Sequence, residues 1–233
     1  MYEAHSSIKT PDEDTTIWRY MSLEKLLSML CTKKLFLNRA DSFLDPWEGV
    51  WPKQFVADIG DSWKEDHVTE FIGASQALRQ TFFVSCWHES KFESAALWDQ
   101  YAKSAGFAIK TTVGKLKHAI TDEKNFFLGR VQYLDYERDN VGELNMLRLP
   151  YMKRKSFQHE NEVRLLHWEI PEGESTPRDS HALSVDLSVL IDEVYTSPTL
   201  DEWLIPHLQE LLVRFDLKSI SLNKSNLYAP HVY

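Results

Sequence analysis

An uninterrupted apolar run, TFFVSCW at residues 81–87, places strong limits on the architecture. A strand with one solvent-exposed face alternates apolar and polar residues, whereas an unbroken run is typical of a strand covered on both faces. We therefore expect residues 81–87 to lie in the interior of a layered domain.

The segments on either side of this run carry mixed helix and strand signals. Aromatic and β-branched residues at 17–21 predict a strand, and Ser22 is placed to cap a helix with leucines at helical spacing. Because strands and helices do not alternate regularly, we expect a single α+β domain and not a doubly wound parallel sheet. Further strands are predicted at residues 35–37, 107–110, 131–136, 162–168, 182–187, 191–196 and 219–222, and further helices at 61–80, 95–103, 113–120 and 200–215. Gly106 is expected to end the helix at 95–103.

Composition gives the outer limits of the domain. Residues 1–16 are polar and acidic and predict a flexible leader, the domain is expected to span residues 17–223, and 224–233 to form a tail. No segment approaches the roughly 18 apolar residues of a membrane span. Cys31 and Cys86 lack metal or redox spacing and are expected to be buried free thiols in a reducing compartment. These features predict a cytoplasmic protein without membrane contact.

The net charge of −9 argues against non-specific binding to phosphate backbones. A local basic patch nevertheless lies between residues 148 and 155, for which a solvated loop that enters a strand is the more ordinary explanation. As a binding surface, it would contact an acidic macromolecule through Arg148, Lys153, Arg154 and Lys155.

Two acids open the strand predicted at 162–168. Residues i and i+2 of a strand share a face, so Glu160, Glu162 and Arg164 are expected to form one charged row. Burying either carboxylate without a partner is costly. The row is therefore either a Glu–Arg pair within a sheet or a carboxylate that binds a hydroxyl or stabilises a developing cation.

Three further groups could carry chemistry. Arg19 stands between Trp18 and Tyr20, which suits binding of phosphate or ribose, or an ordinary surface pair. Trp98 and Tyr101 share a helix face and could sandwich a flat heterocycle or belong to the core. A third group could bind a metal through three acids and a histidine, namely Asp41, Asp45, Glu48 and His88. Acids of this kind are also typical of a tight loop. Nucleophilic catalysis by Ser85 is not expected, because the G-x-S-x-G elbow is absent.

The order of these motifs resembles a widespread bacterial family known mainly as a domain of unknown function. The shared pattern runs from an aromatic-Arg-aromatic strand through the loop with DP-x-E, the strand with SCW, the helix with W-x-x-Y and the G-F pair to the strand with E-x-E-x-R. It spans roughly residues 18–222. The family is similar to the ADP-ribosyltransferase superfamily, which implies a split β-sandwich of short, mainly antiparallel strands with flanking helices.

The resemblance also implies roles for individual residues. It implies that NAD is the substrate, that no metal is needed, and that Arg19, Tyr20, Ser85, Trp98 and Tyr101 contact NAD. Glu162 would be the catalytic carboxylate, with Glu160 as the upstream acid that serves the acceptor. Here Ser85-Cys-Trp replaces the superfamily's S-T-S run.

A mono-ADP-ribosyltransferase is therefore the leading hypothesis, as a toxin or antiphage defence effector that modifies a protein or nucleic acid. Such an effector would be controlled by an antitoxin-type inhibitor. Two alternatives stay open: a non-catalytic binding module on the same fold, and a metal-dependent nuclease built on the acids of the 41–48 loop and His88.

Overall fold

The computed structural model describes residues 1–102, 105–170 and 178–230, and its contacts divide them into two compact units. Unit 1 contains Met1–Thr10, Phe36–Cys86 and Lys124–His181, and unit 2 contains Pro11–Leu35, Trp87–Glu123 and Ala182–Tyr233. The chain passes between the units five times. Because the segments of the two units alternate along the chain, no single linker separates the units in the sequence. The composition therefore indicated one domain.

Unit 1 is built around the first part of β3 (Phe82–Glu89). This strand pairs with β8 (Glu162–Trp168), which pairs antiparallel with β5 (Phe127–Arg130). The end of β2 (Lys34–Arg39) also pairs antiparallel with β3. Phe82, Phe83 and Val84 are at most 2% exposed, so the prediction of a covered apolar strand is confirmed.

Shorter elements of unit 1 surround the entrance to β8. Strands β6 (Gln132–Leu134) and β7 (Met152–Arg154) pair in parallel. Two 3₁₀ helices precede β8 in the chain, η3 (Met146–Tyr151) and η4 (Lys155–Glu160). The sequence predicted β8 at its observed bounds but not β5 or β7, which are short and have no regular alternation.

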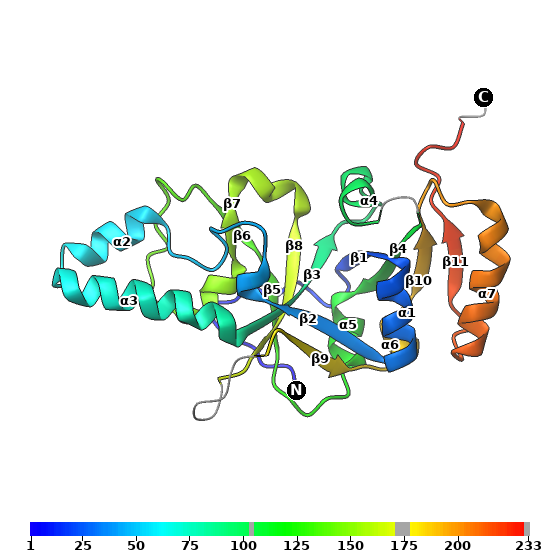
Figure 1. Ribbon diagram of the computed structural model, residues 1–233, viewed down its shortest axis with the longest axis horizontal. Helices are drawn as coiled ribbons and strands as arrows, with labels where there is room; N and C mark the ends of the chain where they lie inside the picture. The colour runs from blue at the N-terminus through cyan, green and yellow to red at the C-terminus, as the bar shows by residue number, and fades with distance from the viewer. Residues whose placement is uncertain (103–104, 171–177, 231–233) are drawn as a thin grey trace. The chain divides into compact units, whose positions relative to one another are not determined.

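Two helices of unit 1 pack side by side, α2 (Lys53–Gly60) and α3 (Glu65–Leu78) (Figure 1). The Trp51 ring stacks on Phe55, with centroids 4.6 Å apart, and lies 5.9 Å from Phe71. Its Nε1 donates to the Ser75 hydroxyl at 3.0 Å. Helix α3 confirms the helix predicted within 61–80, whereas α2 was not predicted. The 3₁₀ turns η1 (Ala40–Ser42) and η2 (Arg79–Thr81) complete this unit's helical elements.

The first ten residues are an integral part of unit 1. Tyr2 forms a β-bridge to Phe126, and the Glu3 amide donates to the Phe126 carbonyl at 2.9 Å. Ile8 is 6% exposed and packs so closely on Gly129 that a Cβ there would lie 2.2 Å from its Cγ2. Backbone hydrogen bonds and one buried side chain thus hold this polar stretch against the rest of unit 1.

Unit 2 contains a sheet in which β4 (Gly106–Thr112) is central. It pairs antiparallel with β1 (Thr16–Ser22) along the whole strand, and with β10 (Glu193–Thr196). Strand β11 (Ser221–Lys224) joins β10 in parallel, and the last residues of β3 pair antiparallel with β1. The described pairings of both units are thus mainly antiparallel, within a mixed α/β arrangement.

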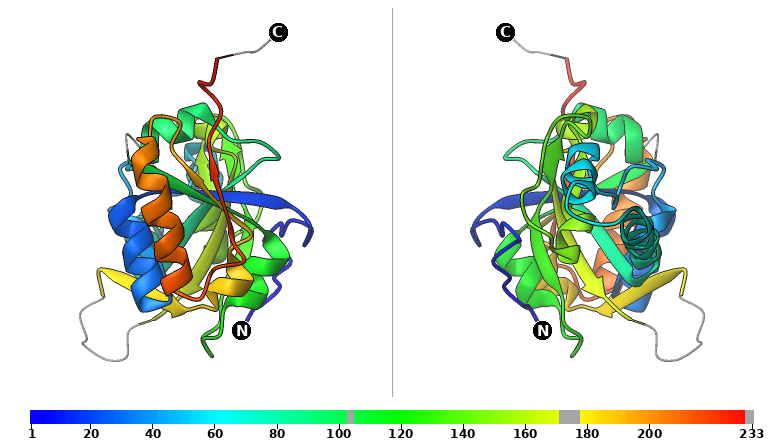
Figure 2. Two further views of the ribbon diagram at one scale, coloured as in Figure 1. Left: turned by 90° about the vertical axis from the view of Figure 1, so that its right-hand side faces the viewer. Right: turned by 90° about the vertical axis from the view of Figure 1, so that its left-hand side faces the viewer.

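Helices α1 (Leu23–Thr32) and α7 (Ile205–Arg214) lie side by side over this sheet, as Figure 2 shows. Leucines of both helices, including Leu26 and Leu212, line the same small apolar space as Phe107 and Val194 of the strands. Cys31 is exposed, which corrects the expectation of two buried thiols; Cys86 is partly buried, and both are free. No described helix is long and apolar enough to cross a membrane.

The remaining elements of unit 2 refine the predicted boundaries. Helices α4 (Ala95–Tyr101), α5 (Val113–Ala119) and η5 (Glu202–Leu204) fall within or beside the predicted ones, while Lys103 lies outside the described residues. Gly106 begins β4 instead of ending α4. A Cβ there would lie 2.1 Å from the Ala102 carbonyl oxygen, so this position requires glycine. The strand predicted at 182–187 is observed as β9 (Ser180–Ser184), since the Asp186 side chain caps α6 (Leu187–Leu190).

Candidate active site

The two acids of the E-x-E motif reach one point from different elements. Glu160 ends η4, Asn161 has a φ of 39°, and Glu162 begins β8. Asparagine tolerates this left-handed conformation better than most residues. The prediction that both acids belong to one strand face is therefore wrong, but the turn at Asn161 still brings their carboxylates together.

Lys153 is the cation on which these carboxylates converge. Its Nζ lies 2.5 Å from Glu160 Oε2 and 2.7 Å from Glu162 Oε1. Glu48 Oε1 is the third partner, at 3.0 Å. Lys153 is 6% exposed, and its Nζ lies 4.8 Å from the centre of the Phe157 ring. Lys153 is thus enclosed by three acids and a ring, and not a member of a solvated patch.

Arg164 closes the arrangement from the strand side. Its Nε donates to Glu162 Oε2 at 2.7 Å, and its Nη2 donates to Glu48 Oε2 at 2.8 Å. The remaining Nη1 donates to the Pro150 carbonyl at 2.7 Å. The Glu162–Arg164 pair, one of the two interpretations of the charged row, is observed, although Glu160 is buried as well. We use the name glutamate cluster for Glu48, Lys153, Glu160, Glu162 and Arg164, all of which belong to unit 1 and are at most 6% exposed.

The glutamate cluster contains three acids and two bases, so full ionisation would leave one buried negative charge. Burial raises the pKa of the Glu160 carboxyl to about 7, and its hydrogen bond with Glu162 and the Glu162 charge act in the same direction. Burial opposes ionisation of Glu162 too, but the Arg164 charge and the hydrogen bond with Glu160 hold the Glu162 pKa well below its usual value. Two neighbouring carboxyl groups therefore favour different protonation states near neutral pH.

Tyr133 and Cys86 lie beside Glu162, and the sequence did not predict either contact. The Tyr133 hydroxyl accepts a hydrogen bond from the Glu162 amide at 2.9 Å, and burial raises its pKa. Cys86 lies near Glu162, and burial together with that acid raises the thiol pKa well above its usual value. The alternation in residues 131–136 indicated a strand but gave no sign that Tyr133 meets the acids. Ser85, which the resemblance relates to NAD, is 1% exposed in β3.

The other basic residues of the 148–155 segment each have acceptors. Arg148 donates to the Val141 carbonyl at 2.7 Å and to the Gln132 amide oxygen at 3.0 Å. Arg154 binds Asp45 through Nε and Nη2 at 3.1 and 2.8 Å, and Lys155 binds Asp139 at 2.9 Å. The exposed part of the patch is thus reduced to cations that are already paired.

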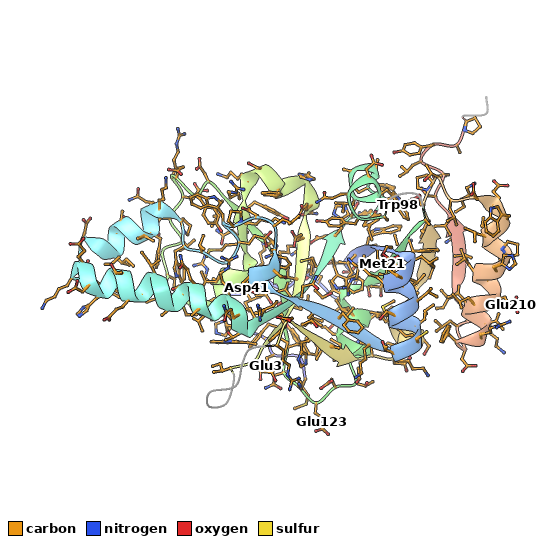
Figure 3. The ribbon with its side chains drawn as sticks, in the orientation of Figure 1. Glu3, Met21, Asp41, Trp98, Glu123 and Glu210 are labelled. Atoms are coloured by element: carbon orange, nitrogen blue, oxygen red, sulfur yellow. The ribbon has the colours of Figure 1, made fainter. Side chains whose placement is uncertain are left out.

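The acids of the 41–48 loop bind basic side chains in the same way. Asp41 accepts from Arg39 Nε at 2.6 Å, and the structure places it in η1 (Figure 3). Asp45 binds Arg154, and Glu48 belongs to the glutamate cluster. His88, the fourth residue of the proposed metal set, belongs to unit 2.

The residues related to NAD in unit 2 lie in or beside a group of rings. We use the name ring cluster for Trp18, Tyr20, Trp98 and Tyr195. Trp98, labelled in Figure 3, is 2% exposed, meets Tyr20 edge to face at 5.0 Å, and donates from Nε1 to Glu93 at 2.9 Å. Tyr20 accepts from the Ser94 amide at 2.8 Å.

Arg19 and Tyr101 differ from this cluster in their exposure. Arg19 is half-buried, with its guanidinium 5.6 Å from the centre of the Trp87 ring. Tyr101 is 47% exposed. Of the two rings at i, i+3 spacing, Trp98 is therefore packed in the core, and Tyr101 is the ring that solvent reaches.

Comparison with known proteins gives only distant similarity. No family model matches the sequence, and no curated protein matches it. Among solved structures, the chain is similar to DarT of Thermus sp. 2.9 in complex with NAD+, at 9% identity and a TM-score of 0.41, over 93% of this chain and 98% of DarT. A complex of the same DarT with ADP-ribosylated single-stranded DNA gives 10% identity, a TM-score of 0.40, and coverage of 94% and 97%. At this distance, the roles of the residues rest on their own geometry.

Proposed function

We propose that the chain is an NAD-dependent ADP-ribosyltransferase whose chemistry is carried by Glu160 and Glu162. The observation that supports this is the pair itself: two carboxyl groups bound to one lysine, one with its pKa raised to about 7 and the other with its pKa held low. Pairs whose environments separate their pKa values are suited to divide the roles of acid, base and charge stabiliser.

Glu162 and Glu160 have different roles in the proposed reaction. The bond between ribose C1 and the nicotinamide nitrogen breaks, and its electron pair leaves with nicotinamide. The ionised Glu162 stabilises the positive charge that develops on the ribose. The acceptor atom then bonds to C1, and its proton passes to the Glu160 carboxylate, whose pKa near 7 suits a general base at neutral pH. None of these steps needs a metal.

The proposal assigns the remaining roles as the sequence resemblance implies. NAD contacts are proposed for Arg19, Tyr20 and Tyr101, within a split β-sandwich of the superfamily kind. Ser85 and Trp98, which are 1% and 2% exposed, would contact NAD only after the side chains that cover them move. For the acceptor we propose a protein or nucleic acid that meets the segment through Arg148, Arg154 and Lys155, while Lys153, which is 6% exposed, supports this segment from within the glutamate cluster. An effector of this kind would act in the cytoplasm as a toxin or antiphage factor, restrained by an inhibitor protein.

Nicotinamide release tests the chemistry. The purified chain is incubated with NAD, and with RNA, single-stranded DNA and lysate as acceptors, beside Glu162→Gln, Glu160→Gln and the exposed control Glu137→Gln. We expect release by the parent and the control, and a loss of roughly 100-fold or more in Glu162→Gln. Circular dichroism and thermal unfolding establish that each variant is folded.

Glu160→Gln separates chemistry from folding. Glutamine resembles the protonated form of Glu160, so at pH 6 this variant should keep the parent's unfolding temperature and still lose transfer to an acceptor. A folded Glu160→Gln or Glu162→Gln variant with full activity would contradict the assigned roles.

A non-catalytic binding module is the second candidate, and the closure of the glutamate cluster favours it. Glu160 and Glu162 are 4% and 6% exposed, and both bind Lys153. As a module, the chain would release no nicotinamide under any of these conditions, and Glu162→Gln would change stability alone.

A further inference from the structure

Two buried histidines of unit 1 face each other away from the glutamate cluster. His167 lies near the end of β8 and is 6% exposed, and His181 lies near the start of β9 and is 5% exposed. Their ring centroids are 4.5 Å apart. Glu169 follows β8, and one ligand atom from each of the three residues lies within 4.8 Å of the other two.

Each histidine has a nitrogen without a hydrogen bond. His167 Nδ1 lies 2.8 Å from the Asn125 carbonyl oxygen, so Nδ1 carries the proton and Nε2 keeps its lone pair. Among the described residues, His167 Nε2 and His181 Nδ1 have no hydrogen-bond partner. Glu169 Oε2 lies 3.4 Å from His181 Nδ1. Buried polar atoms without partners are costly, which indicates that this arrangement is incomplete.

We propose that His167, His181 and Glu169 form a binding site for a divalent transition metal ion of the zinc class. Two imidazoles and one carboxylate are a common ligand set for such ions, whereas magnesium and calcium prefer oxygen ligands alone. The contact between His167 Nδ1 and a backbone carbonyl is the outer-shell arrangement that orients a metal-binding histidine. Phe83, with its ring 5.6 Å from His181, provides an apolar wall.

Metal binding requires only a small movement of the three ligand atoms. Nitrogen and oxygen ligands lie about 2.0–2.2 Å from zinc, so two ligands of a tetrahedral ion are roughly 3.4 Å apart. The ligand atoms must therefore approach one another by at most about 1.4 Å from their present limit of 4.8 Å. Glu169 has a side chain that is 31% exposed and can make this adjustment.

Lys124 competes with the metal ion for His181 and Glu169. Its Nζ lies 3.2 Å from His181 Nε2 and 4.0 Å from Glu169 Oε1. An ammonium donates its proton, so His181 Nε2 is the acceptor and Nδ1 holds the proton while Lys124 is in place. When the metal binds Nδ1, this proton moves to Nε2 and Lys124 leaves toward solvent, which its 39% exposed side chain permits.

Metal titration of the full chain tests the site. After chelator treatment and dialysis, cobalt(II) binding is followed by visible absorption and zinc binding by calorimetry. We expect one equivalent to bind, and binding to weaken by roughly tenfold or more in His181→Gln and Glu169→Gln, with no change in the exposed control His67→Gln. In Lys124→Ala we expect tighter binding than in the parent, since the competing ammonium is gone.

Glu169→Gln and Lys124→Ala keep the test decisive if a histidine variant fails to fold, because both residues are partly exposed. Absence of a bound equivalent in the parent, or equal affinity in the parent and Glu169→Gln, would overturn the assignment. The titration does not depend on NAD chemistry, so its result is separate from that of the proposed function.

Discussion

The glutamate cluster of unit 1 and the ring cluster of unit 2 both bury polar atoms, but they satisfy these atoms by different means. In the glutamate cluster, charged side chains are the main partners of one another: Arg164 donates to Glu162 and Glu48, and its third hydrogen bond goes to the Pro150 carbonyl. In the ring cluster, each ring buries its carbon surface and directs one polar atom to a nearby acceptor or donor, such as Trp18 Nε1 to the Ser90 carbonyl. The first arrangement should be sensitive to charge and pH, and the second to volume.

Removal of one buried charge should have the largest effect. Arg164→Met leaves Glu48 and Glu162 without their main cation, and we expect a loss of about 3–5 kcal/mol in the free energy of unfolding. Urea unfolding followed by fluorescence measures this loss. The matched control Lys53→Met breaks an exposed pair with Glu137 and should cost about 0–1 kcal/mol. Equal losses in both variants would remove the distinction between buried and exposed pairs here.

A change of ring volume should have a smaller effect. Trp98→Phe shortens a ring that is 2% exposed and removes its hydrogen bond to Glu93, and we expect a loss of about 1–2 kcal/mol. The exposed control Trp203→Phe should stay within about 0.5 kcal/mol of the parent. A loss that varied strongly between pH 5 and pH 8 would contradict the view that volume dominates in the ring cluster.

The pH dependence of stability should report on Glu160. Its pKa is about 7 in the folded chain and about 4.3 in an unfolded one, so the folded state holds more protons between these values. Stability should therefore fall as pH rises from about 4.5 to 7. The low pKa of Glu162 has the opposite sign, and its contribution is lost only at more acidic pH. Unfolding at a series of pH values should show the fall in the parent and its absence in Glu160→Gln.

The smallest effect is expected at the rim of the basic segment. Lys155 and Asp139 form a pair with side chains 55% and 35% exposed. Lys155→Ala should cost at most about 1 kcal/mol. If the same variant lowered affinity for single-stranded DNA without a change in unfolding, the segment would gain a role in binding an acceptor.

The comparison also explains what the sequence could reveal. The covered strand at 81–87 and the helix after Ser22 were predicted from local pattern, because their side chains repeat with the period of the element. The meeting of Glu162 with Arg164 was predictable for the same reason. The approach of Glu48 to these residues was not, since it depends on contacts between segments more than a hundred positions apart.

Individual residues show why some interpretations failed. Lys153 looked like a solvated cation because its neighbours in sequence are basic, whereas its neighbours in space are acids. Trp98 and Tyr101 share a helix face in the sequence pattern, yet one is packed in the core and the other is exposed.

The repeated passage of the chain between the units has a consequence for synthesis on the ribosome. Unit 1 receives its last residues at His181, and unit 2 receives residues up to the end of the chain. Neither unit can complete its contacts until most of the polypeptide has emerged, and such contacts between distant segments are slow to form. No single truncation would release one intact unit, so a fragment chosen by a simple cut would expose apolar strands that the missing segments normally cover.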